Sequence, residues 1–352
     1  MFFQKSQTLL GLNIGSSYIK VVELNNSGSR YTLQNFGYAV LPSDTIVDGT
    51  IMDSMAIVNA IKNLVENLKI KKKKICTSIS GHSVITKKIL MPLMDEATVE
   101  NTIQDEAVHH IPYDIFDVNL DFQILGPSSE ANDKMDVLLV AVKKDVINDY
   151  LGVIEEAGLQ PAIVDVDTFA LENMYEYNYE EVTDKIVTLV DIGSNITNIN
   201  IIKDGISNFN RDITVGSRQI TEQLQKQLNL NYQTAEQLKL GVPVEGLKHD
   251  DTIKLISDAS FAYINEIAKT IDFYHTSASG NQVETIYLAG GGAKLTGIVE
   301  AVQEITNIPT EIIDPFRNLI IPEKKFDHEY IRDIAPLAGV AVGLALRKDR
   351  IK

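Results

Sequence analysis

The chain contains one short motif twice, and this repeat limits its possible folds more than any other feature. Residues 12–17 read Leu-Asn-Ile-Gly-Ser-Ser, and residues 190–195 read Val-Asp-Ile-Gly-Ser-Asn, 178 positions later. In both copies, apolar residues on either side of a Gly-Ser turn are typical of two strands joined by that turn. One such turn is an ordinary β-hairpin, but two copies at equivalent positions predict two related halves whose turns face each other across a cleft.

The composition of the two turns suits a ligand that carries phosphate groups. Glycine has no Cβ, so the backbone amides around Gly15 and Gly193 can approach phosphate oxygens closely. Asp191 stands at the end of the second predicted strand. Its carboxylate can hold a water molecule of a bound Mg²⁺ there, or it can cap the turn. The sequence therefore predicts a phosphate clamp formed by both turns.

A third glycine-rich segment, Gly290-Gly291-Gly292, follows a short apolar run and precedes a predicted helix. Three glycines cost backbone entropy, so a close approach must offset that cost. Either a base or ribose lies against the backbone here, or the strand turns tightly into the helix. The segment matches neither the Walker phosphate loop nor the dinucleotide-binding fingerprint, which excludes those two nucleotide sites.

Several local signals predict helices. Asp53 is a suitable N-cap residue before apolar residues at helical spacing. A second helix is expected to start at Asp95 and to stop at Pro112. Residues 338–343 consist of alanine, valine and glycine, which predicts a helix that packs very close to its neighbours.

Size and charge exclude several classes of protein. A chain of 352 residues predicts two or three domains, and 44% hydrophobic with 23% charged residues is ordinary globular usage. The net charge of −16 repels nucleic acid, and a lone cysteine, Cys76, favours a reducing compartment such as the cytosol. The N-terminus lacks the pattern of a signal peptide. The longest apolar run, residues 334–346, is shorter than the roughly 20 residues that span a bilayer.

The two turns, the glycine cluster and the segment Ala235-Glu236-Gln237-Leu238-Lys239 occur in an order that resembles the actin, sugar kinase and heat-shock chaperone superfamily over the whole chain. This resemblance implies an α/β fold, the actin-like (ribonuclease H-like) two-lobed ATPase fold, with ATP and Mg²⁺ as cofactors. The residues that it implies for cofactor binding are Asn13, Gly15, Ser16, Ser17 and Lys20 at the β-phosphate, Asp191, Gly193, Ser194 and Asn195 at the γ-phosphate and metal, Glu236 and Lys239 at the ribose or base, and Gly290, Gly291 and Gly292 beneath the base.

Two positions bear on catalysis. Asn13 stands where the superfamily usually has aspartate, and an amide cannot supply the negative charge that helps to hold Mg²⁺. We therefore expect nucleotide binding with weak or absent hydrolysis. Asp167 falls where relatives keep a residue that positions water, which makes it the candidate catalytic base. Its side chain could equally cap the helix that starts at Thr168.

The segment after Gly81 resembles the extra subdomain of the bacterial actin relative FtsA. We expect an inserted subdomain at residues 84–160, a first lobe of 1–83, 161–184 and 335–352, a second lobe of 185–228 and 282–334, and a helical subdomain at 229–281. More narrowly, the chain resembles the PilM family of type IV pilus assembly proteins. Four stretches carry that resemblance: residues 14–24, residues 106–123, residues 165–171, and residues 314–316 together with 341–347.

The narrower resemblance implies a cytoplasmic adaptor that is recruited to the inner face of the bacterial inner membrane. Its partner would be the N-terminal cytoplasmic tail of the membrane protein PilN, bound between the insert and the first lobe, with residues 84–91 and 106–113 as walls. Other platform proteins, the pilus motor ATPases and further copies of the chain are additional candidate partners. A filament-forming protein like FtsA and a small-molecule kinase of the same superfamily are the alternative functions.

Overall fold

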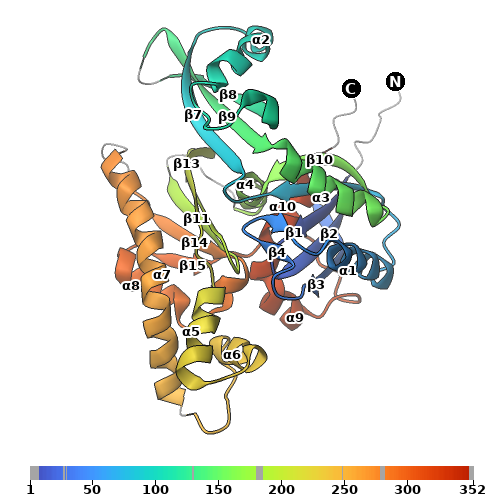
Figure 1. The fold of residues 1–352 in the computed structure, drawn as a ribbon, viewed down its shortest axis with the longest axis vertical. Coiled ribbons are helices and arrows are strands. Elements are labelled where there is room, and N and C mark those ends of the chain that lie inside the picture. The colour runs from blue at the N-terminus through green and yellow to red at the C-terminus, as the bar shows by residue number, and fades with distance from the viewer. Residues whose placement is uncertain are drawn as a thin grey trace.

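The two halves of the chain form two sheets with the same topology (Figure 1). A computed structural model describes residues 8–26, 28, 30–128, 131–179, 185–247, 249–277 and 282–348. The first sheet has the order β10-β6-β1-β2-β3, and the second has the order β15-β14-β11-β12-β13 when it is read in the same sense. In each sheet the first three strands of the half are antiparallel neighbours, and the two later strands run parallel to the first. The predicted internal repeat is confirmed.

The strands and helices of each lobe follow from these orders. The first sheet consists of β1 (Leu10–Ile14), β2 (Tyr18–Asn26), β3 (Tyr31–Val40), β6 (Lys74–Ile79) and β10 (Gln160–Val166), with α1 (Ser54–Asn67), α3 (Lys144–Glu156) and the hairpin β4 (Ile46–Val47) and β5 (Thr50–Ile51) beside it. The second consists of β11 (Ile186–Ile192), β12 (Thr197–Lys203), β13 (Ile206–Ile213), β14 (Thr285–Ala289) and β15 (Thr310–Ile312), with α5 (Arg218–Leu228), α6 (Tyr232–Lys239), α7 (His249–Ser277) and α8 (Ile298–Thr306).

Helices α4 (Asp167–Asn178) and α10 (Gly339–Leu346) meet where the lobes join. Both contribute to one apolar core that also contains Val22 of the first sheet and Leu189 of the second. The small residues of α10 make this contact possible: a Cβ on Gly343 would lie 1.7 Å from the carbonyl oxygen of Ala170 in α4. The C-terminal segment before α10 contains α9 (His328–Ile334) and the short helix η3 (Ala335–Ala338).

The insert is a separate small layer that projects from the lobes in Figure 1. Its sheet has the order β7-β9-β8, formed by β7 (Val84–Pro92), β9 (Lys134–Lys143) and β8 (Val118–Pro127), with α2 (Glu96–Ala107) and η1 (Ile115–Asp117). Val99 and Ile103 of α2 pack on Val137 and Leu139 of β9 in a core of their own.

Helix α3 differs from the expected division of the chain. The expected insert runs to residue 160, but Ile147, Tyr150 and Ile154 of α3 pack in the core of the first sheet, and β10 is a strand of that sheet. The reason is that a 13-residue amphipathic helix needs an apolar surface, and the first sheet supplies one. The layer that projects from the lobes therefore comprises residues 84–143.

No helix within the described part of the chain is long and apolar enough to cross a membrane.

Candidate functional site

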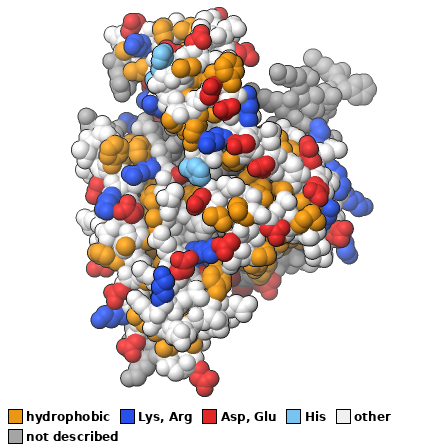
Figure 2. Space-filling model, in the orientation of Figure 1, with side chains coloured by type: hydrophobic (Ala, Val, Ile, Leu, Met, Phe, Trp, Pro, Cys, Tyr) orange, Lys and Arg blue, Asp and Glu red, His pale blue; other side chains and the backbone are white. Residues whose placement is uncertain are grey.

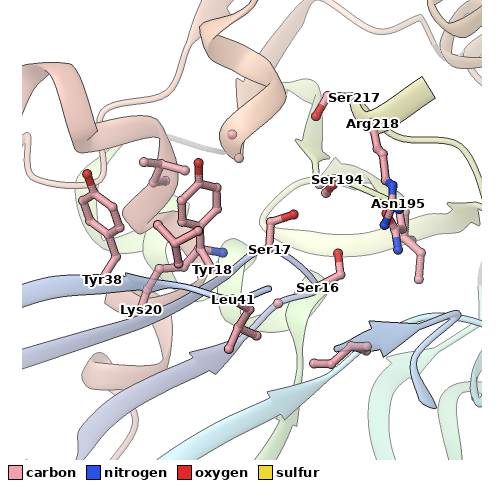
Figure 3. A pocket seen from close by; sticks show the side chains of 18 of the residues that line it. Ser16, Ser17, Tyr18, Lys20, Tyr38, Leu41, Ser194, Asn195, Ser217 and Arg218 are labelled. Carbon is pink, nitrogen blue, oxygen red and sulfur yellow. The ribbon is translucent and has the colours of Figure 1, made fainter. Parts of the chain in front are cut away.

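A cleft of about 550 Å³ lies between the two lobes. Figure 3 shows side chains from both repeated turns pointing toward this space, with Ser16 and Ser17 on one lobe and Ser194 and Asn195 on the other. The predicted site residues that line the cleft are Asn13, Gly15, Ser16, Ser17, Lys20, Asp167, Asp191, Gly193, Ser194, Asn195, Glu236, Lys239, Gly290 and Gly291. Gly292 is the predicted residue that does not line it.

The two turns have the same local geometry. The amide of Gly15 donates to the carbonyl oxygen of Tyr18, and the amide of Gly193 donates to that of Ile196, each at 3.0 Å. A Cβ on Gly193 would lie 2.5 Å from the Ile196 carbonyl oxygen, which is closer than such atoms ever come. Both turns are therefore tight, and each brings backbone amides to the cleft at the end of a buried strand.

A network of polar side chains forms the floor of the cleft beside the first turn. The Lys20 ammonium donates to Asn13 Oδ1 at 2.9 Å, and Asn13 Nδ2 donates to Asp167 Oδ1 at 3.2 Å. The Ser78 hydroxyl donates to the same Asp167 oxygen. Burial lowers the pKa of Lys20, although the carboxylates of Asp191 and Asp167 oppose this effect. Asn13 thus links the cation to the candidate catalytic carboxylate.

Asp167 is the first residue of α4 and Val166 is the N-cap; the hydrogen bonds that the Asp167 carboxylate accepts come from side chains and not from amides of that helix. The alternative that Asp167 serves as a helix cap is therefore wrong. The carboxylate lies on the cleft floor, where burial raises its pKa while hydrogen bonds from Ser78 and Ser80 and the charge of Lys20 lower it. A base needs a free acceptor near its substrate. Two donors already occupy Asp167 Oδ1.

Asp191 is a partly buried carboxylate at the second turn, and it lines the cleft. Burial raises the pKa of Asp191 to about 6; the charge of Lys20 opposes this rise, and the carboxylates of Asp167 and Asp212 add to it. No group of the described residues donates a hydrogen bond to the Asp191 carboxylate. A buried charge without donors is costly. A cation from outside the chain would relieve that cost.

The glycine cluster makes the tight packing considered from the sequence, and two of its three glycines also line the cleft. Gly290 has a φ of 82°, and a Cβ there would lie 2.3 Å from Asp191 Oδ1, so a side chain at this position would displace the carboxylate. A Cβ on Gly292 would overlap the Ile192 side chain at 1.9 Å. Gly290 and Gly291 line the cleft, whereas Gly292 permits tight packing of the turn η2 (Gly291–Lys294) on β11.

Glu236 and Lys239 lie one turn apart on α6, at the wall of the cleft. The Lys239 ammonium donates to Glu236 Oε1 at 2.5 Å, to Thr221 Oγ1 at 2.8 Å and to the Ser217 carbonyl oxygen at 3.3 Å. An ammonium group has three donors, so these bonds use all of them. In this conformation Lys239 fastens α6 to α5, and Glu236 is the more exposed member of the pair.

The cleft also contains residues that the sequence analysis did not select, among them Tyr18, Ser80, Arg218 and Tyr232. Ser78 lies near the carboxyl end of β6, a buried strand parallel to β1, and Ser80 follows that strand. Polar residues at the carboxyl end of such a strand are a signal that could have been used. Arg218 and Tyr232 each begin a helix of the second lobe. No motif marks them.

The residues present fit a nucleotide with Mg²⁺. Two tight turns supply backbone amides for phosphate oxygens, and the Asp191 carboxylate is the hard oxygen donor that Mg²⁺ prefers. Among the described residues, no group of three histidine, cysteine or carboxylate side chains could hold a metal by itself. Asp191 would therefore hold Mg²⁺ together with water and phosphate oxygens, which is usual for this ion.

Comparison with known proteins identifies the family. The family described as "Type IV pilus assembly protein PilM" matches residues 11–349. The chain belongs to the PilM family. A solved structure of a "PilM-PilN type IV pilus biogenesis complex" is similar to this member of the PilM family, with a TM-score of 0.86 and 27% identity over 97% of this chain and 98% of that one.

More distant relatives confirm the actin-like, two-lobed fold. Cell division protein FtsA of Streptococcus pneumoniae serotype 2 (strain D39 / NCTC 7466) is 22% identical over 348 residues, which is 87% of this chain and 75% of FtsA. MreB5 of Spiroplasma citri, solved bound to ADP, has a TM-score of 0.53 at 13% identity, over 96% of this chain and 94% of MreB5. Ethanolamine utilization protein EutJ from Carboxydothermus hydrogenoformans has a TM-score of 0.58 at 17% identity, over 97% and 89%.

Proposed function

We propose that this PilM-family chain is a nucleotide-binding adaptor that binds the N-terminal cytoplasmic tail of PilN at the inner face of the bacterial inner membrane. The observation that carries the proposal is that a complete two-turn cleft and a separate folded insert occur in one chain of this family. ATP with Mg²⁺ would occupy the cleft and stabilise one arrangement of the lobes. The insert would present the surface for the tail.

The junction between the insert and the first lobe has the features of a peptide site. The Tyr113 hydroxyl donates to the His82 carbonyl oxygen at 3.0 Å, and the Lys144 ammonium donates to the Phe116 carbonyl oxygen at 2.7 Å. These bonds hold the segment after α2 against the base of the insert. The Phe116 side chain is nevertheless 80% exposed, and Val108 is 55% exposed. Exposed apolar side chains on a fixed segment are typical of docking sites.

The face of the insert drawn in Figure 2 is also accessible. Figure 2 shows it projecting from the rest of the surface, with hydrophobic side chains among charged ones. Both predicted walls belong to this layer: residues 84–91 lie in β7, an edge strand of the insert sheet, and residues 106–113 lead from α2 to the junction. An edge strand can accept an extended peptide by strand addition, which would suit an N-terminal tail.

Weak hydrolysis completes the proposal. Asn13 uses its amide to join Lys20 and Asp167, so the position that would carry a carboxylate beside Mg²⁺ is neutral here. Asp167, whose Oδ1 already accepts hydrogen bonds from Asn13 and Ser78, would contribute little to the activation of water. The function of bound ATP would then be conformational, and an assay of released phosphate should detect turnover no faster than that of an Asp167→Ala variant.

Truncation of Phe116 tests the docking site. We expect Phe116→Ala to weaken binding of a synthetic PilN tail about tenfold or more, because burying an aromatic side chain at an interface contributes a few kcal/mol. The matched control is Phe261→Ala on α7, a phenylalanine that is 60% exposed on the second lobe. Fluorescence anisotropy with a labelled tail measures both. Equal affinity for the two variants would contradict the assignment of this junction.

A further inference from the structure

Arg218 connects the two lobes at the mouth of the cleft. Its Nη2 donates to Asp44 Oδ1 at 2.8 Å, and Asp44 lies in the loop between β3 and β4 of the first lobe. Its Nε donates to Glu222 Oε1, one helical turn away, at 3.2 Å. The guanidinium group is therefore held between a carboxylate of its own helix and a carboxylate of the opposite lobe.

The same residue lies directly beside the second repeated turn. The amide of Arg218 donates to the Ser194 carbonyl oxygen at 3.0 Å, which fixes the start of α5 to that turn. Figure 3 shows the Arg218 side chain next to Asn195, and Arg218 is one of the residues that line the cleft. A phosphate group at the second turn would thus have a guanidinium group as its neighbour.

Arg218 differs from the other cations that line the cleft in how many of its hydrogen-bond donors remain available. Lys239 uses all three of its donors on protein atoms, and Lys294 is paired with Asp333 at 2.8 Å. Lys20 lies on the cleft floor at the first turn. A guanidinium group has five N–H donors, and the two bonds to Asp44 and Glu222 leave three. Arg218 can therefore bind an anion without giving up its contact with the first lobe.

We propose that Arg218 binds the terminal phosphate of a nucleoside triphosphate at the second turn, with Asp44 as its positioning residue. This rests on the proposed nucleotide binding. The planar guanidinium group can donate two parallel hydrogen bonds to phosphate oxygens while its bond to Asp44 is kept. A ligand whose phosphate chain reaches the second turn would therefore join α5 to the loop after β3. A ligand that is one phosphate shorter would reach the first turn alone. It would leave the Arg218–Asp44 ion pair without a phosphate partner, and such a pair contributes little when it is exposed.

Nucleotide titrations with matched variants test this role. Arg218→Gln keeps much of the side chain and removes its charge; Lys269→Gln on α7 removes one charge from a surface ion pair far from the turns. Calorimetry measures binding of Mg·ATP, Mg·ADP and adenosine to each full-length variant. We expect Arg218→Gln to weaken ATP binding about tenfold or more, since a hydrogen bond to a charged group contributes that much. The affinity of Arg218→Gln for ADP should fall much less, and its affinity for adenosine should not change. Lys269→Gln should bind all three ligands as the unaltered chain does.

The positioning role of Asp44 has its own readout. Asp44→Asn should weaken ATP binding but not adenosine binding, and Asp44→Glu should restore it. In the Arg218→Gln background, Asp44→Asn should have no further effect, because residues that act through one contact are not additive. Thermal unfolding of every variant confirms that the chain is folded.

The outcomes are distinct. ATP binding by Arg218→Gln that equals that of the unaltered chain would overturn the inference, and so would an equal loss for ATP, ADP and adenosine. An unaltered chain that binds no nucleotide would overturn the proposed function and this inference together. Selective loss of the triphosphate in Arg218→Gln supports both.

Discussion

The raised pKa of Asp191 means that its charged form lowers the stability of the ligand-free chain. Its folded-state pKa of about 6 lies above the ordinary value of 3.8 because the carboxyl is buried. The folded chain therefore holds this proton more tightly than the unfolded chain does. The contribution of Asp191 to stability is greatest below pH 4 and is lost as the pH rises through 6. At neutral pH the ligand-free chain carries a charge on Asp191 that Lys20 compensates only in part.

Replacing Asp191 by Asn removes that charge. We expect the ligand-free variant to be more stable than the unaltered chain at pH 7.5 by about 1 to 3 kcal/mol and equally stable at pH 4. It should also lose the stabilisation that Mg·ATP gives. Urea unfolding at both pH values, with and without Mg·ATP, measures this. A variant that is less stable at pH 7.5 would show that Asp191 is a structural residue rather than a cation ligand.

The candidate site was predictable residue by residue where the sequence carries a motif, and not where residues meet only through packing. Gly15, Gly193 and Asp191 follow from the repeat because strand-turn-strand geometry is local. The ion pair of Arg218 with Asp44 joins positions that are 174 residues apart, so no spacing signal exists for it. The engagement of Lys239 with Thr221 and Ser217 also depends on how α5 and α6 pack, which the sequence of neither helix specifies.

For the helices, the starts of α1 and α2 were predictable from the sequence, and the C-terminal end of α2 was less so. Asp53 caps α1 with its side chain, as predicted, and Asp95, where the second helix was expected to start, caps α2 in the same way. Helix α2 ends at Ala107, before Pro112, and residues 108–110 continue as turns. The residue before a proline avoids helical geometry, and the chain leaves the helix a few residues earlier still.

The close contact between α10 and α4 can be tested by adding a single methyl group. Gly343→Ala places a Cβ against the Ala170 carbonyl oxygen, so the helices must separate, and we expect a loss of about 3 kcal/mol of unfolding free energy. The matched control is Gly152→Ala in α3, where a Cβ meets nothing within 4 Å and should add about 0.5 kcal/mol. Chemical denaturation compares the two. Equal stabilities would mean that the lobes do not depend on this contact.

For the whole molecule, the repeat and the insert were visible in the sequence, but the packing of α3 was not. The repeated turns lead to two sheets of identical order, and the insert forms a third sheet of its own. Whether an amphipathic helix covers the insert or the first lobe depends on which surface is bare. That question is decided by tertiary structure and not by periodicity.

Two deletions test whether α3 belongs to the insert or to the first lobe. The Lys143 amide donates to the Ser83 carbonyl oxygen at 3.2 Å, so the two ends of the projecting layer are adjacent. Removing residues 84–143 with a short Gly-Ser linker should leave a folded chain that binds nucleotide. Removing residues 84–160 takes away α3 and the start of β10, so that variant should not fold cooperatively. Circular dichroism melts distinguish them, and similar melts would place α3 outside the core of the first lobe.

The most direct test of the account is to titrate the PilN tail and Mg·ATP, separately, into the unaltered chain and into the variant that lacks residues 84–143. The account predicts that both ligands bind the unaltered chain, and that the deletion abolishes binding of the tail while the affinity for Mg·ATP is unchanged. Retained binding of the tail by the deletion variant, with its fold intact, would contradict it.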